Sequence, residues 1–95
     1  MNSCGGEQGE NYFYSVNVIN NTGSTITVRY DWDILFISPD WLGITTIPAG
    51  NNEIIEWISG NSVGEQIEVE YLGKKKLYTV TQLGTTIVTM QDFQN

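Results

Sequence analysis

The sequence predicts an all-β fold, because apolar and polar residues alternate with a period of two along most of the chain, as in half-buried strands. Clusters rich in glycine and asparagine interrupt this alternation roughly every 10 residues, which is typical of tight turns between short strands. The chain has 95 residues, enough for one hydrophobic core and too few for two. We therefore expect a single antiparallel β-sandwich.

The first two predicted strands span residues 12–20 and 24–32. In the first, alternation places three apolar side chains on the inward face: Tyr14, Val16 and Val18. In the second, the inward face would carry Ile26, Val28, Tyr30 and Trp32. The intervening "NNTGS" supplies residues that tolerate the backbone angles of a tight turn.

Five further strands are expected at residues 41–47, 53–58, 66–72, 75–82 and 86–93, each rich in β-branched or aromatic residues. In the strand at 66–72 the core face would hold Ile67, Val69 and Tyr71, while Glu68 and Glu70 face water. No helix longer than about two turns is expected. Seven strands of this kind, separated by turns, are typical of an immunoglobulin-like sandwich.

The composition excludes several classes of function. Eleven acidic and four basic residues give a net charge of −7, so nucleic acid and bare phospholipid headgroups would be repelled. The sequence has no histidine and one cysteine, which excludes histidine-dependent catalysis, an intramolecular disulfide and the usual zinc ligand sets. We expect no cofactor and no enzymatic activity. No apolar run is long enough for a membrane-spanning helix.

The N-terminal residues differ in composition from the rest of the chain. Residues 1–10 contain three glycines, two glutamates and the only cysteine, Cys4, a composition that cannot form a packed core. We therefore divide the chain into a flexible tether, residues 1–11, and a sandwich domain, residues 12–95.

Cys4 at the head of this tether resembles the mature N-terminus of a bacterial lipoprotein, and Ser3 matches the small residue expected before such a cysteine. The "MN" before it is not an apolar signal sequence, so a signal would have to precede this sequence. The domain resembles small lipoproteins of Bacteroidetes in "INNTGSTITV" (19–28) and "TTIPAGNNEII" (45–55). The resemblance implies a lipid at Cys4 and a periplasmic or surface location in the cell envelope. The alternative is an incidental thiol.

Acidic residues offer two possible sites. Asp31, Asp33 and Asp40 crowd one segment and could bind Ca²⁺, but the segment lacks the glycine turn and final glutamate of a calcium loop. Solvated aspartates beside a strand are the better interpretation, and we expect no metal. The two carboxylates of a glycoside hydrolase could come from Glu53, Glu56, Glu65, Glu68 and Glu70. A sandwich of this size offers little cleft, and Glu68 and Glu70 are neighbours on one solvent-facing side, so a solubilising face is the better interpretation.

The three tryptophans are candidates for recognition, because exposed indoles stack on sugars and anchor protein interfaces. Alternation places Trp32 inward and leaves both faces open for Trp57. Trp41 follows Pro39 in an irregular stretch and is the best candidate for exposure. Core packing is the main alternative for all three.

The segment from Asp31 to Leu42 departs most from the alternation. Its apolar run, residues 34–37, is compatible with an extra strand, an irregular crossover or a plug at an open end of the sandwich, and Pro39 would end a strand. Sequences break local rules most often where they carry function. We therefore place the candidate binding surface here, on Asp31, Asp33, Phe36, Asp40 and Trp41.

Together these features predict a noncatalytic, extracytoplasmic binding or accessory module of the bacterial envelope, anchored through Cys4. Its partner would be a protein or a glycan, and its only membrane contact would be the lipid anchor. The alternative is a structural subunit of a surface fibre or phage particle that associates through edge strands.

Overall fold

The computed structural model describes residues 11–33 and 40–94. In chain order the elements are β1 (Tyr12–Asn21), β2 (Ile26–Asp33), β3 (Asp40–Ile47), β4 (Asn52–Ser59), β5 (Gln66–Tyr71), β6 (Lys74–Thr79), β7 (Thr85–Thr89) and a 3₁₀ turn, η2 (Met90–Phe93). Within the described ranges, no helix has the length and apolar character needed to cross a membrane. The prediction of an all-β fold with seven strands is confirmed. Cys4, Phe36 and the predicted tether up to residue 10 lie outside the described residues.

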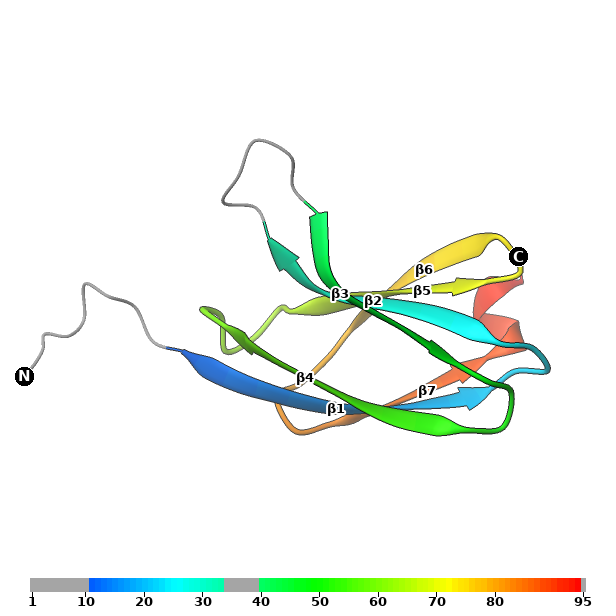
Figure 1. Cartoon of the computed structure of the whole chain (residues 1–95), viewed down its shortest axis with the longest axis horizontal. Coiled ribbons are helices and arrows are strands. Elements are labelled where there is room, and N and C mark those ends of the chain that lie inside the picture. The colour runs from blue at the N-terminus through cyan, green and yellow to red at the C-terminus, as the bar shows by residue number, and fades with distance from the viewer. Residues whose placement is uncertain (1–10, 34–39, 95) are drawn as a thin grey trace, which may run out of the picture.

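The strands form two sheets that face each other, as Figure 1 shows. One sheet has three strands in the order β4-β1-β7, and the other has four in the order β3-β2-β5-β6. The hairpin pairs β2–β3 and β5–β6 lie within the four-stranded sheet, whereas the other connections cross between sheets. The molecule is therefore a β-sandwich, as predicted.

One strand pair differs from the expected antiparallel arrangement, because β1 and β7 run parallel, with Asn17 opposite Thr85 and Asn21 opposite Thr89. Successive strands in this sandwich alternate in direction, so β1 and β7 point the same way. Every other pair joins an odd-numbered to an even-numbered strand and is antiparallel. Periodicity identifies strands but does not tell which of them become neighbours.

The core lies between the sheets and follows the predicted alternation. Its fully buried members are Tyr14, Val16, Val18, Ile26, Val28, Ile47, Ile67, Val69 and Val88. Burying one such side chain stabilises the fold by about 1.5–3 kcal/mol. Glu68 and Glu70 lie on the opposite face of β5 from Ile67 and Val69, as expected. Tyr30 and Tyr71 pack at the edge of the core and are partly buried.

A buried polar residue, Asn20, holds the two sheets together at one end. Its side-chain amide donates hydrogen bonds to the carbonyl oxygens of Ser24 and Ile47, both at 2.8 Å. Its side-chain oxygen accepts from the backbone N–H and the hydroxyl of Thr22, at 2.9 and 2.6 Å. Because each polar atom of this side chain has a hydrogen-bond partner, its burial avoids the free-energy cost of an unsatisfied polar group.

The backbone of Asn20 also forms hydrogen bonds with the turn between β3 and β4. The backbone N–H of Gly50 donates to the carbonyl of Asn20 at 3.0 Å, and the N–H of Asn20 donates to the carbonyl of Asn51 at 2.9 Å. Gly50 has φ of 79°, a conformation that glycine adopts without a steric penalty. The segments "NNTG" and "IPAGNN" are therefore turns, and they meet at Asn20.

The predicted strands at 75–82 and 86–93 extend too far. β6 ends at Thr79, and β7 ends at Thr89, where the chain turns into η2. The Asp92 carboxylate accepts a hydrogen bond from the Tyr78 hydroxyl at 2.6 Å and one from the backbone N–H of Thr89 at 3.2 Å. Phe93 is buried against Tyr71, with ring centroids 5.2 Å apart. These tertiary contacts favour the turn over a longer strand.

Candidate functional site

The predicted binding residues lie at the end of the β2–β3 hairpin. The backbones of Asp33 and Asp40 are paired across the two strands, and those of Trp32 and Trp41 are paired one step further in. The carboxylate of Asp40 accepts a hydrogen bond from the N–H of Trp41 at 2.7 Å and is exposed. The structure therefore brings Asp31, Asp33, Asp40 and Trp41 together on one hairpin, whereas Phe36 lies outside the described residues.

The strand β2 bends at Asp31, whose φ of 63° lies in the left-handed region. This region is unfavourable for most residues, but aspartate visits it more readily than others. The β2–β5 pairing is continuous from Ile26 only as far as Arg29. Beyond this point β2 pairs with β3 alone, and Figure 1 shows the two strands rising together away from the rest of the sheet.

This bend overturns the prediction for Trp32. Simple alternation places the side chain in the core, but it is 45% exposed. Because β2 turns away from the sandwich at Asp31, Trp32 lies beyond the core. The period of two therefore no longer predicts whether its side chain is buried. The sequence leaves open whether the Trp57 side chain faces the core or the solvent, and it is only 6% exposed. Trp41, the expected exposed tryptophan, is half-buried.

Trp32 and Trp41 form an aromatic pair at the hairpin. Their ring centroids are 4.9 Å apart and the ring planes are inclined at 62°, an edge-to-face arrangement. Such pairs contribute about 0.5–1.5 kcal/mol beyond the burial of their surfaces. The pair is therefore a preformed aromatic corner, held by backbone pairing on both strands.

A pocket of about 450 Å³ lies beside this corner. Its walls come from the β2–β3 hairpin, the β4–β5 loop and the adjoining ends of β5 and β6. The lining residues are Trp32, Trp41, Asn61, Gly64, Glu65, Gln66, Glu68 and Leu77. This volume falls in the range of sites that hold a small molecule or a large side chain, about 300–1,000 Å³.

The β4–β5 loop is fixed by contacts with the core. The hydroxyl of Tyr14 donates to the carbonyl oxygen of Asn61 at 2.9 Å. The carboxylate of Glu65 accepts from the Asn61 side-chain amide at 3.1 Å and from the Trp57 indole N–H at 3.4 Å. Trp57 in turn stacks on Tyr14, with centroids 5.0 Å apart. One wall of the pocket is thus tied to the aromatic part of the core.

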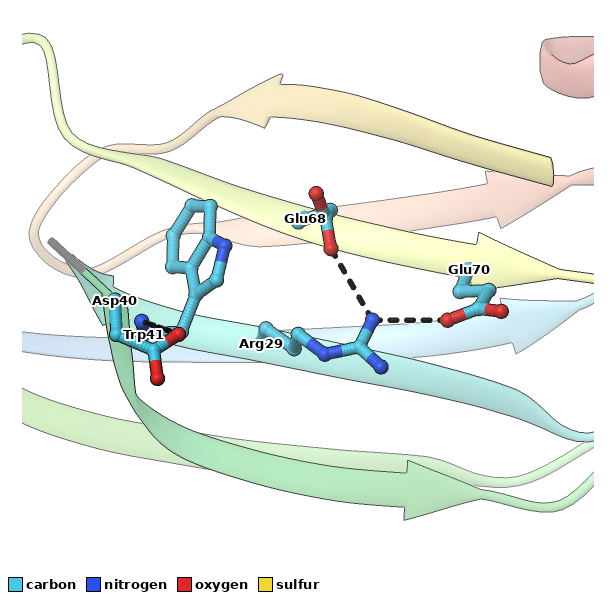
Figure 2. A network of polar contacts seen from close by, with 5 residues as sticks. All are labelled: Arg29, Asp40, Trp41, Glu68 and Glu70. Atoms are coloured by element: carbon cyan, nitrogen blue, oxygen red, sulfur yellow. Dashed lines mark hydrogen bonds and ion pairs between the residues drawn. The ribbon is translucent and has the colours of Figure 1, made fainter. Parts of the chain in front are cut away.

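On the outer face of the four-stranded sheet, Arg29 lies between two carboxylates, as Figure 2 shows. One guanidinium nitrogen is 3.1 Å from Glu68 and 2.9 Å from Glu70. The hydrogen bond with Glu70 is the main cause that raises the pKa of Arg29. Glu68 both lines the pocket and belongs to this cluster, so its charge is partly balanced by Arg29. By contrast, the two donors that bond the Glu65 carboxylate are neutral.

Most of the pocket residues were not among the predicted site residues. Glu65 and Glu68 look like members of a solvated acidic face, and Asn61 and Gln66 look like turn and strand residues. The sequence offers one signal, the placement of aspartate before Trp32, since aspartate permits the left-handed bend. In the part of the chain that the structure describes, no three His, Cys, Asp or Glu side chains are grouped to hold a metal ion.

Comparison with protein-family models, with curated proteins and with solved structures finds no significant match. The immunoglobulin-like type of the sandwich and the lipoprotein resemblance carried by Cys4 therefore remain predictions. Chemically, the pocket offers two indole rings, two carboxylates, two side-chain amides and one apolar side chain, Leu77. These groups are suited to noncovalent recognition through stacking, cation–π contact and hydrogen bonding.

Proposed function

We propose that this chain is a noncatalytic binding module and that its ligand is held in the pocket between the β2–β3 hairpin and the β5–β6 strands. The observation that carries the proposal is the Trp32–Trp41 corner at a pocket of about 450 Å³. Keeping a tryptophan 45% exposed forgoes the stabilisation that its burial would give. Exposed aromatic anchors beside a pocket are a common feature of recognition sites.

A binding role fits the chemistry of the lining residues better than catalysis does. The chain has no histidine, and histidine is the side chain that most often transfers protons near neutral pH. The carboxylates of Glu65 and Glu68 already accept hydrogen bonds from neighbouring side chains. Those bonds hold the two groups in place as fixed acceptors and negative charges.

We further propose that the module acts outside the cytoplasm, anchored by a lipid at Cys4. The single cysteine and the resemblance of residues 3–4 to a lipoprotein N-terminus support this location. Tyr12, the first residue of β1, pairs with Ser59 at the end of β4, and the β4–β5 loop that follows lines the pocket. A tether entering at this end would hold the pocket on the side of the domain that faces the anchor.

The binding role can be tested by screening the purified domain against arrays of peptides and glycans, with Trp32→Ala and Trp41→Ala as site variants. Loss of an aromatic hot-spot residue weakens binding by about 30-fold or more. Leu83→Ala is the matched control, because Leu83 is an exposed apolar residue outside the pocket. Ligands whose binding is equal in all four proteins would contradict the proposed site, as would the absence of any ligand.

A second candidate function is a structural subunit that associates through edge strands. The edge strands β3 and β4 are each eight residues long and carry exposed apolar side chains: Leu42, Ile44, Ile54 and Ile58. By contrast the edge strand β6 carries Lys74, Lys75 and Lys76, charges that discourage strand pairing. The asymmetry favours association through β3 and β4.

This candidate is tested by sedimentation velocity over a range of protein concentrations. Ile44→Lys should abolish any self-association through β3, and Leu83→Lys, in a turn, should not. A wild-type protein that remains monomeric at high concentration would exclude self-association through these edges.

A further inference from the structure

We infer that the pocket recognises a positively charged group, specifically the side chain of a lysine or arginine in a basic peptide segment. Trp32 and Trp41 would form the aromatic walls, and Glu65 would supply the opposing charge. This inference rests on the proposed binding function and names the chemistry of its ligand.

The shape of the aromatic pair favours a compact cation over a flat ring. Two indoles inclined at 62° with centroids 4.9 Å apart form a corner, so a group placed in it approaches both rings. A cation within about 6 Å of an aromatic ring centre is attracted by the negative face of the ring. A sugar ring stacks best on a single flat platform, and an inclined pair gives it only one wall.

The charges around the pocket have the matching sign. Two of the lining residues, Glu65 and Glu68, are acidic, and none of the lining residues that the structure describes is basic. Among the residues that the structure describes, the side-chain donors to Glu65 are the neutral groups of Asn61 and Trp57, and these bonds do not neutralise its negative charge. The net charge of −7 would also attract a basic partner over longer distances.

The neighbouring ion-pair cluster adds to this negative potential. Glu68 and Glu70 share a single cation, Arg29. Lys75 lies opposite Glu70 in the β5–β6 register, so the acidic charge nearest the pocket is that of Glu68, which shares Arg29, and of Glu65. Glu68 is only 19% exposed, and partial burial weakens solvent screening, which strengthens the attraction for a cation.

Leu77 explains how a long side chain could fill the remaining volume. It lines the pocket opposite Glu68 in the β5–β6 register and is half-exposed. Lysine and arginine carry an apolar stem behind the charged head. The stem can lie on Leu77 while the head sits between the indoles and Glu65. The amides of Asn61 and Gln66 could bind sugar hydroxyls, but a neutral sugar would bring no positive charge to the Glu65 carboxylate.

The probe is a short capped peptide with one central lysine, compared with the same peptide in which that lysine is acetylated. Binding is followed in the wild-type protein by the indole N–H resonances of Trp32, Trp41 and Trp57 in two-dimensional NMR spectra. The lysine peptide should shift the Trp32 and Trp41 signals. Acetylation removes the charge and should weaken binding by roughly 10-fold or more. Added salt should weaken it as well.

The charge of the pocket is tested with Glu65→Gln, which removes the negative charge and keeps one of the two side-chain oxygens that accept hydrogen bonds from Trp57 and Asn61. The matched control is Glu53→Gln, since Glu53 is exposed on β4 and does not line the pocket. Glu65→Gln should weaken binding of the lysine peptide severalfold and Glu53→Gln should leave it unchanged. Unchanged positions of the remaining backbone resonances would show that both variants are folded.

Three results would overturn the inference, and they separate it from the proposed function. Equal binding of the lysine and acetyl-lysine peptides at the pocket would show recognition that does not depend on charge. Shifts of Trp32 and Trp41 with a neutral chitin trisaccharide, and none with the lysine peptide, would identify a glycan site. In both cases the proposed binding function stands. If no probe moves the two signals, the cationic ligand is excluded, and the array screen alone then decides the binding function.

Discussion

The side-chain amide of Asn20 in β1 donates a 2.8 Å hydrogen bond to the carbonyl oxygen of Ile47 in β3 and so links the two sheets. The same side chain also bonds to Ser24 and Thr22 in the β1–β2 turn. The backbone of Asn20 binds the β3–β4 turn through Gly50 and Asn51. One buried asparagine thus organises both turns at this end of the sandwich.

Replacing Asn20 by alanine should lower the free energy of unfolding by about 2–4 kcal/mol, because buried groups such as the Ile47 carbonyl lose their partner. The measurement is urea denaturation followed by tryptophan fluorescence. Asn21→Ala is the control, since Asn21 is the next residue of β1 and is exposed; we expect a change within about 0.5 kcal/mol. Similar losses for the two variants would show that the buried hydrogen bonds do not explain the effect.

The hydrogen bond between Tyr78 and Asp92 should make stability depend on pH at both extremes. The bond from the tyrosine hydroxyl is the main cause that lowers the pKa of Asp92 in the folded state. Stabilisation by a lowered pKa is present above the ordinary aspartate value of about 3.9 and is lost as pH falls through the folded value. Burial, with the hydrogen bond second, raises the pKa of Tyr78, so its contribution is present below about pH 10 and is lost above it.

Tyr78→Phe removes this hydroxyl. It should lower stability at neutral pH and make stability depend less on pH at both the acidic and the basic extreme. The profile is obtained from thermal unfolding at a series of pH values. The control is Tyr71→Phe, since Tyr71 is a partly buried tyrosine like Tyr78 and its hydroxyl is not part of the Asp92 bond. A variant profile parallel to that of the wild type at both extremes would contradict the assignment.

The proposed lipid anchor predicts how the protein partitions. Expressed from its full gene in its native host, the protein should enter the detergent phase of a phase-separation assay, and Cys4→Ser should move it to the aqueous phase. A single acyl chain gives only marginal membrane binding, whereas two or more give stable anchoring. Equal partitioning of the two proteins would exclude the anchor. Gln8→Asn, which keeps both Ser3 and the cysteine, serves as the control.

The sequence predicts the strands better than the site, for a physical reason that Trp32 illustrates. Alternation reports burial correctly for Tyr14, Val16 and Val18, because β1 pairs with β4 without interruption through these residues. Trp32 follows a left-handed residue, and a change in one backbone angle redirects everything after it. The pocket joins Trp32 and Trp41 of this hairpin to the β4–β5 loop, which lies beyond β4 in the sequence, a relation set by tertiary contacts rather than by local pattern.

The parallel pairing of β1 with β7 and the end of β7 follow the same logic. Both depend on which elements meet in space. At the end of β7 the contacts are made by Tyr78 and Phe93, which lie on another element or beyond the strand end. The segments "NNTG" and "IPAG" identify turns from their composition alone. Their meeting at Asn20 becomes visible only in the structure.

Two substitutions at Asp31 can distinguish the effect of its left-handed backbone conformation from the effect of its carboxylate. Asp31→Gly and Asp31→Val both remove the carboxylate and any contact that it makes, but only glycine adopts φ of 63° without a steric cost. A β-branched residue is strongly disfavoured there. Asp31→Val should therefore be less stable than Asp31→Gly by about 1–2 kcal/mol.

The bend also determines the position of the Trp32–Trp41 pair, which gives the two variants a second difference. In Asp31→Gly the left-handed conformation remains available, so the exciton signal of the two indoles in far-ultraviolet circular dichroism should be retained. In Asp31→Val an extended conformation would turn Trp32 away from Trp41, and the signal should fall along with binding at the pocket. If both variants lose the signal equally, the side chain of Asp31 rather than its backbone conformation holds the corner in place. If both keep it, the pairing of β2 with β3 is sufficient, and the bend follows from the pairing rather than causing the exposure of Trp32.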